Sequence, residues 1–273
     1  MKRYRILLFD FDTRINVLVK LEEICHSNPT LQLQHQIDQI TFELRIYYGE
    51  KGFEQKLQNL KEIGGKQFSI IAYHNVLLGQ IRESFINGYY YPALTAACAL
   101  GERILNHLVL DLRELYNNTD DYEKVKDKKS FSNWDMMIKT LTSWNILLPN
   151  VIEKFETLKT LRHKSIHFNQ NLINDLRAYS LQSITLIQKI LFEQFSAFGN
   201  QPWFITSIPG EIYLKKEWEN NPFIAKYYIP NSALVGHKHK ILNVMPLSIE
   251  DLVDYGDEVI SDEKFSNFRR NQN

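Results

Sequence analysis

Apolar residues recur at helical spacing through most of the chain before residue 199. Residues at positions i, i+3, i+4 and i+7 lie on one side of a helix, and an apolar side of this kind is buried against neighbouring elements. Turn-forming pairs such as Asn28-Pro29 and Gly64-Gly65 interrupt the pattern and mark helix ends. The pattern predicts helices at 15–24, 31–48, 53–63, 69–85, 92–115, 134–147, 151–161 and 172–195.

The helix predicted from Pro92 is rich in small residues, which allow another helix to approach closely. We expect it to pack within a bundle of four or five helices with short connections. Residues 117–129 are charged and polar, which predicts a solvated loop. The small residues are Ala93, Ala96, Ala97, Ala99 and Gly101.

Both ends of the chain have a different character. Residues Tyr4 to Phe11 are apolar and aromatic, as in a short strand, and after residue 199 prolines separate short aromatic runs. We therefore expect a mainly α fold, an up-and-down helix bundle with a short N-terminal α/β segment and a small β-rich C-terminal extension. The predicted division is 1–66 for the N-terminal segment of strand and short helices, 67–199 for the bundle, and 200–273 for the extension.

The composition indicates a soluble globular protein, with 44% hydrophobic and 23% charged residues among 273. The 32 basic and 32 acidic residues cancel, which argues against extended electrostatic binding along a nucleic acid but allows a local basic cleft. Cys25 and Cys98 are far apart, so neither a disulfide framework nor a structural zinc site is expected. The apolar run of residues 6–9 is too short for a signal sequence or membrane span, so we predict a cytoplasmic protein that does not associate with membranes.

Candidate chemistry gathers where one predicted helix gives way to the next, at Arg162, His163 and His167. Arginine offers a planar set of donors that suits phosphate oxygens, and histidine exchanges a proton near neutral pH. A plainer alternative is a basic helix end that complements the helix dipole. Residues five apart lie about 140° apart around a helix, so Arg162 and His167 converge only if the helix ends between them or a second subunit contributes. Asn169 is suited to cap the following helix.

An Arg-x4-His motif between amphipathic helices, preceded by a Gly88-Tyr89-Tyr90 turn into a small-residue helix, resembles the HEPN superfamily of helical domains. The resemblance covers roughly the middle half of the chain and leaves both ends unexplained. His163 stands where that family often has Asn or Asp.

The resemblance implies a two-fold dimer in which two motifs line one cleft and cleave RNA without a metal or other cofactor. Arg162 and His167 would be catalytic, with His163, Glu102 and Asn169 in supporting roles. The implied partners are RNA, a second copy of the chain and a regulatory protein or antitoxin, as in a toxin or antiviral defence effector. The alternative is a catalytically inactive module that binds RNA or nucleotide or acts as a protein-interaction scaffold. Glu102 itself has plainer alternatives, which are pairing with Arg103 or Arg113, or exposure to solvent.

Two further patterns are weaker. Asp10-Phe11-Asp12 after a predicted strand resembles the nucleophile motif of haloacid-dehalogenase phosphatases, but the chain lacks alternating strands and helices, so we expect these aspartates in a turn. His163 and His167, four residues apart, could share a metal ion on a helix, with His237 and His239 as further ligands, but Lys164 would repel a cation, so we expect no metal site.

The aromatic residues Tyr227 and Tyr228 lie beside a basic stretch that includes Lys238 and Lys240. Such a patch can stack on and pair with single-stranded RNA. Aromatic residues of a small β-rich unit are more often core, and we predict that role for both tyrosines while leaving the lysines open.

Overall fold

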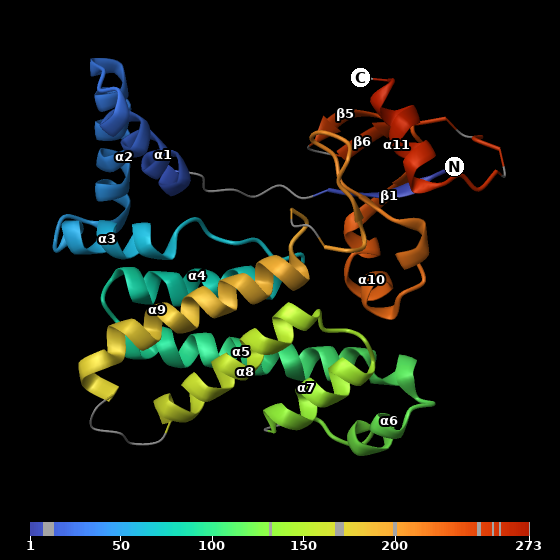
Figure 1. The fold of residues 1–273 in the computed structure, drawn as a ribbon, viewed down its shortest axis with the longest axis horizontal. Coiled ribbons are helices and arrows are strands. Elements are labelled where there is room, and N and C mark those ends of the chain that lie inside the picture. Colours follow the sequence, from blue (N-terminus) through green and yellow to red (C-terminus); the bar gives the residue numbers. More distant parts are fainter. Residues whose placement is uncertain are drawn as a thin grey trace.

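The computed structural model describes residues 1–7, 14–130, 133–166, 172–198, 201–244, 247–252, 254–256 and 258–272. Helices form most of this part of the chain, and two small antiparallel sheets lie near its ends (Figure 1). The predicted mainly α fold with a small β extension is confirmed. The main helices are α1 (Arg14–Ser27), α2 (Leu31–Tyr48), α3 (Phe53–Ile63), α4 (Ala72–Ile86), α5 (Tyr90–Leu112), α6 (Asp120–Val125), α7 (Trp134–Ser143), α8 (Pro149–Ile166) and α9 (Leu172–Ile190).

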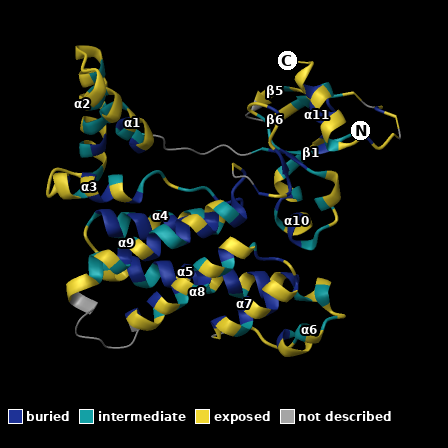
Figure 2. Ribbon diagram, in the orientation of Figure 1, coloured by how far each residue is buried: buried dark blue, intermediate teal, exposed yellow. Residues whose placement is uncertain are grey.

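Helix α5 is the centre of the bundle, because α4, α7, α8 and α9 all pack against it. By length and composition the described stretch Tyr90–Tyr116 is apolar enough to cross a membrane, but 56% of its apolar segment is buried inside the protein. Figure 2 shows this burial as the dark blue of α5 and its neighbours. Its apolarity is therefore that of a core helix. The buried residues are Ala93, Leu94, Ala97, Cys98, Leu100, Gly101, Ile104, Leu105, Leu108, Val109 and Leu112.

Close approach of α5 and α8 depends on Gly101. A Cβ atom built on Gly101 would lie 2.6 Å from Leu158 Cδ2 and 3.0 Å from Trp134 Cη2. These separations are shorter than van der Waals contact, so a larger residue here would require the side chains of Leu158 and Trp134 to shift. The small-residue pattern thus places the next residue of α5, Glu102, close to α8.

Helices α1 and α2 form a hairpin that extends away from the bundle (Figure 1). Only a few of its side chains, Ile15, Leu18 and Leu44, are buried, and most of α2 is exposed or half-buried (Figure 2). Its remaining described surface carries exposed apolar residues such as Phe42 and Ile46.

The loop predicted at 117–129 is wrong in part, because residues Asp120–Val125 form the short helix α6. Acidic residues in its first turn stabilise this helix through their interaction with the helix dipole, and Asp121 forms an ion pair with Lys124 at 2.6 Å. Val125 is fully buried and anchors this helix to the bundle.

The two chain ends share one sheet. Its strand order is β2-β3-β1-β4, with all neighbours antiparallel, so β1 lies between two strands from the C-terminal part. The register pairs Arg3 with Val235 and Arg5 with Ala233 on one side, and Arg5 with Tyr213 on the other. Residues 14–198 are thus an insertion between β1 and the rest of its sheet. The strands are β1 (Arg3–Ile6), β2 (Phe204–Ile205), β3 (Tyr213–Leu214) and β4 (Ser232–Val235), and a separate hairpin is formed by β5 (Lys240–Val244) and β6 (Leu247–Glu250).

The three-part division of the chain stays a prediction, although the strand of its N-terminal segment pairs with strands of its C-terminal extension. The strand predicted at Tyr4 to Phe11 is described as β1 only at Arg3–Ile6, and residues 8–13 lie outside the described residues. Helices α10 (Pro222–Tyr227) and α11 (Asp262–Arg270) complete this part.

Candidate functional site

Arg162 lies near the C-terminal end of α8 and faces α5. Its Nε donates a hydrogen bond of 2.8 Å to Oε2 of Glu102, and both side chains are about one-quarter exposed (24% and 23%). An ion pair at this depth is shielded from water more than a surface pair, yet a ligand can still reach it. Of the alternatives considered for Glu102, the structure shows an ion pair with Arg162.

The packing below the ion pair explains its geometry. Leu158 and Leu161 are buried on the inner side of α8, and Leu158 rests on Gly101 of α5. Arg162 follows one turn after Leu158, and Glu102 follows directly after Gly101, so the close helix contact brings the two charges together.

The guanidinium of Arg162 retains donors for a ligand. Within the described part of the chain, Nε alone has a protein acceptor, and no group accepts a hydrogen bond from Nη1 or Nη2. Two parallel N–H groups suit bidentate contact with a phosphate or carboxylate. The site is therefore arranged to take an oxyanion at the outer end of Arg162.

The other residues of the motif are placed only in part. His163 is exposed. The Nζ of Lys164 lies 5.0 Å from the ring centroid of Tyr179 on α9. His167 and Asn169 lie outside the described residues, so the convergence of Arg162 and His167 stays a prediction.

Cys98 lies close to Arg162 but is a buried thiol. Burial raises its pKa to about 12, against the opposing effects of the Arg162 charge and a hydrogen bond with Ser165. The sulfur is thus protonated at neutral pH, and a thiolate nucleophile is not available at this position.

An open groove of about 390 Å³ runs along α5 from the ion pair. The apolar and polar pattern of the sequence did not predict this groove. The available signal was the spacing of Arg103 and His107, four residues apart on a helix whose other faces are apolar. The groove is lined by Ala99, Glu102, Arg103, Asn106, His107, Leu110, Lys129 and Ser130.

His107 is oriented by a tyrosine. The ring atom Nδ1 lies 2.7 Å from the hydroxyl of Tyr73, and the two rings meet edge to face with centroids 4.9 Å apart. Burial, together with the charge of Asp111, raises the pKa of Tyr73. The phenol therefore stays protonated and holds the imidazole in place across the physiological pH range.

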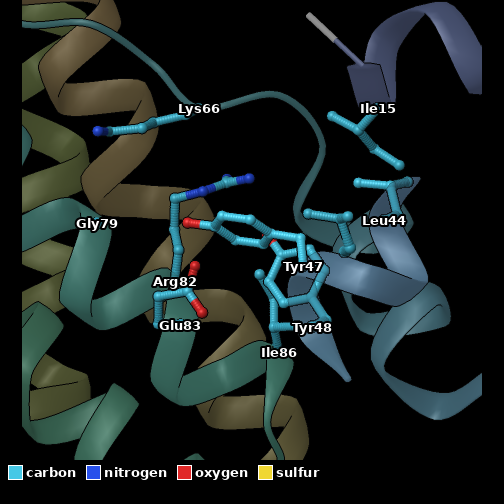
Figure 3. A pocket seen from close by; sticks show the side chains of 10 residues that line it. Ile15, Leu44, Tyr47, Tyr48, Lys66, Gly79, Arg82, Glu83 and Ile86 are labelled. Carbon is cyan, nitrogen blue, oxygen red and sulfur yellow. The ribbon is translucent and has the colours of Figure 1, made fainter. Parts of the chain in front are cut away.

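A second cavity, of about 290 Å³, lies between α2 and α4 (Figure 3). Tyr47, Tyr48, Lys66 and Arg82 line it together with apolar side chains. The guanidinium of Arg82 donates to the backbone oxygen of Gly64 at 2.6 Å, so it joins helices here. No histidine is among the described residues that line this cavity, which makes it a weaker candidate for proton-transfer chemistry.

The described residues contain no group of three or more His, Cys, Asp or Glu side chains suited to hold a metal ion. His237 and His239 are both buried, and His239 Nδ1 lies 2.7 Å from the backbone oxygen of Gly236 while its Nε2 lies 2.5 Å from Arg5. These histidines therefore serve the core of the C-terminal part. Asp10 and Asp12 lie outside the described residues.

The tyrosines of the C-terminal patch are also structural. Tyr228 is fully buried and donates to the backbone oxygens of Gln194 (2.9 Å) and Ser196 (3.1 Å). Tyr227 is half-buried and donates to Asp111 Oδ2 at 2.9 Å. The core role predicted for Tyr228 is confirmed, and Tyr227 joins the C-terminal part to α5.

Comparison with known proteins gave no match to a family model, to a curated protein or to a solved structure.

Proposed function

We propose that the chain is a metal-independent endoribonuclease of HEPN type, in which Arg162 and His167 act on RNA. The observation that carries the proposal is the half-buried Arg162–Glu102 ion pair, which fixes the arginine by Nε and leaves Nη1 and Nη2 without a described protein acceptor. An arginine fixed in this way is suited to stabilise negative charge that develops on phosphate oxygens.

In the proposed reaction His167 removes the proton of a ribose 2′-hydroxyl, and the 2′-oxygen attacks the adjacent phosphorus. The bond from phosphorus to the 5′-oxygen breaks, and that oxygen takes a proton from an acid in the same site. The products are a 2′,3′-cyclic phosphate and a 5′-hydroxyl, and neither an oxidant nor a metal enters the balance. Proton transfer by a positioned side chain supplies roughly 10²–10⁴-fold, and alignment by Arg162 adds to it.

The proposal includes a two-fold dimer through the helices that carry Glu102 and Arg162. A single Arg-His pair provides few groups for the reaction, and an isologous contact would bring a second copy of each. A histidine of the second copy would then protonate the leaving oxygen. A cytoplasmic location and a regulatory protein or antitoxin complete the proposal.

The test is incubation of the purified full chain with single-stranded RNA in EDTA, followed by analysis of the ends. We expect cyclic phosphate ends, and a rate at least about 10²-fold lower for Arg162→Ala and for His167→Ala. The double variant should be no slower than the slower single one if both residues act in one step. If His167 is open to substrate, as the proposal requires, the melting temperature of His167→Ala should stay close to that of the parent protein, since substitutions at exposed positions change stability by less than about 0.5 kcal/mol. Cleavage that persists in both variants would refute the assignment, and a strict monomer by light scattering would refute the composite site.

The second candidate is a catalytically inactive module that binds RNA or nucleotide or serves as a scaffold. The observation in its favour is that the Glu102 carboxylate compensates the charge of Arg162 at 2.8 Å. A compensated arginine attracts phosphate less strongly. Binding of RNA without any cleavage by the parent protein would favour this function.

A further inference from the structure

The groove on α5 holds two cations that have no anionic partner in the described structure. Arg103 lies on α5 and Lys129 lies after α6, and both are exposed and line the same groove. Neither forms an ion pair or hydrogen bond with another described residue. Two such cations at one groove attract an anion, because the one carboxylate among the described lining residues pairs with Arg162 and not with either of them.

Glu102, the only carboxylate among the groove's described lining residues, does not cancel this charge. Its Oε2 is occupied by Arg162 at 2.8 Å, so the ion pair as a whole is neutral. Asn106 and Ser130 add polar groups to the lining. The groove is therefore positive overall and offers both charge and hydrogen bonds to a ligand.

The groove also adjoins the Arg162–Glu102 ion pair, because Glu102 is one of its lining residues. Glu102 belongs both to the ion pair and to the groove, and Asn106 and His107 follow roughly one turn along α5, about 6–8 Å away. A chain whose phosphate rests on Arg162 would thus pass along the groove. The groove is more open than the cavity between α2 and α4, which suits a passing strand better than an enclosed small molecule.

We propose that this groove is a phosphate-binding subsite for single-stranded RNA, in which Arg103 and Lys129 contact a phosphate next to the one held by Arg162. His107, held by Tyr73, borders the same subsite. The subsite rests on the proposed function for its substrate, but its binding role does not require that the chain cleaves RNA. Phosphate contacts of this kind position a strand and read no sequence.

The test compares Arg103→Gln/Lys129→Gln with Lys51→Gln/Lys189→Gln, which removes the same charge from exposed residues outside the groove. Both pairs are made in the full chain with His167→Ala, so that RNA stays intact during the measurement. Binding of a fluorescein-labelled single-stranded RNA of about twelve nucleotides is followed by anisotropy from about 50 to 200 mM salt. Circular dichroism melting shows that each variant is folded.

We expect the groove variant to bind about tenfold more weakly at the lowest salt, while the control pair stays within about twofold. The slope of log K against log salt should flatten by about 0.7, since each neutralised phosphate contributes about 0.7 for a single strand and the two side chains share one phosphate. Equal binding by the two pairs, or an absence of RNA binding, would overturn the subsite. If the groove variant binds RNA more weakly but the parent protein does not cleave RNA, the subsite is supported and the proposed reaction is rejected. If the parent protein cleaves RNA but the groove variant binds it as well as the control pair does, the reaction is supported and the subsite is rejected.

Discussion

At the scale of single residues, Glu102 has two opposing effects on Arg162. The hydrogen bond from Nε to Oε2 restricts the guanidinium to one orientation, which lowers the entropy lost when a phosphate binds. The same carboxylate compensates the charge of Arg162, which weakens the attraction of the arginine for a phosphate. The balance of these effects decides whether Glu102 raises or lowers the rate of the proposed RNA cleavage.

Glu102→Gln separates the two effects, because glutamine keeps the shape and an amide oxygen for Nε but removes the charge. If Glu102 acts by orienting Arg162, the single-turnover cleavage rate should fall only a few-fold in Glu102→Gln and about tenfold or more in Glu102→Ala. The dissociation constant for RNA should fall in Glu102→Gln, which keeps the orientation of Arg162 and removes the compensating charge. Cleavage at the parent rate in Glu102→Ala would show that the ion pair has no positioning role.

At the scale of elements, Arg82 joins three helices of the structure. This side chain on α4 is 6% exposed, and it donates to Gly64 O at 2.6 Å after α3 and to Gln188 on α9. Gln188 Nε2 in turn donates to Ile63 O at 2.9 Å. The carbonyl groups at the end of α3, which lack partners within the helix, thus accept hydrogen bonds from side chains of α4 and α9.

Arg82→Met should destabilise the protein by about 3 kcal/mol in urea unfolding. Methionine has a similar length and apolar body, but it leaves the acceptors at Gly64 and Gln188 without this donor, and each orphaned group costs roughly 1–3 kcal/mol. Arg103→Met, on the exposed side of α5, is the matched control and should change stability by less than about 0.5 kcal/mol. A loss below about 1 kcal/mol for Arg82→Met would mean that water replaces the arginine.

At the scale of the whole molecule, the first strand completes a sheet whose other strands lie some two hundred residues later. Arg3 is 1% exposed and donates to Ile260 O at 2.7 Å and to Asp262 at 2.8 Å, at the start of α11. Arg5 pairs with Glu211 at 2.9 Å, and Glu211 also accepts from Arg269 at 2.6 Å, which lowers the pKa of Glu211 to about 2 despite its burial. These contacts therefore join the N-terminal strand to the C-terminal part of the chain and stabilise both.

Deletion of residues 1–6 should unfold the C-terminal part while the bundle stays folded. The sheet would lose the strand between β3 and β4, and Glu211 and Asp262 would each lose an arginine partner. Hydrogen exchange followed by mass spectrometry should show lost protection at residues 201–272 and retained protection in α5 and α9. Truncation after Arg270 is the control and should leave both parts protected. Unchanged protection of the sheet in the deletion would show that β1 is dispensable.

The helices of the bundle were predictable because their cause is local. A helix repeats every 3.6 residues, so an apolar stripe records both the helix and the side that it buries. Pro92 lies in the first turn of α5, as predicted, and Gly101 provides the close approach expected of the small residues. The sequence also identified Arg162 and Glu102 as polar positions beside this packing.

Tertiary structure decided which of these polar groups meet. Glu102 had Arg103 as its neighbour in sequence, yet it pairs with Arg162, sixty positions away, because α5 and α8 touch at Gly101 and Leu158. The burial of His239 and the place of β1 in a C-terminal sheet depend in the same way on long-range packing. Periodicity records what a segment must bury, but it contains no information about which distant segment will cover it. That partner is set only when the whole chain is packed.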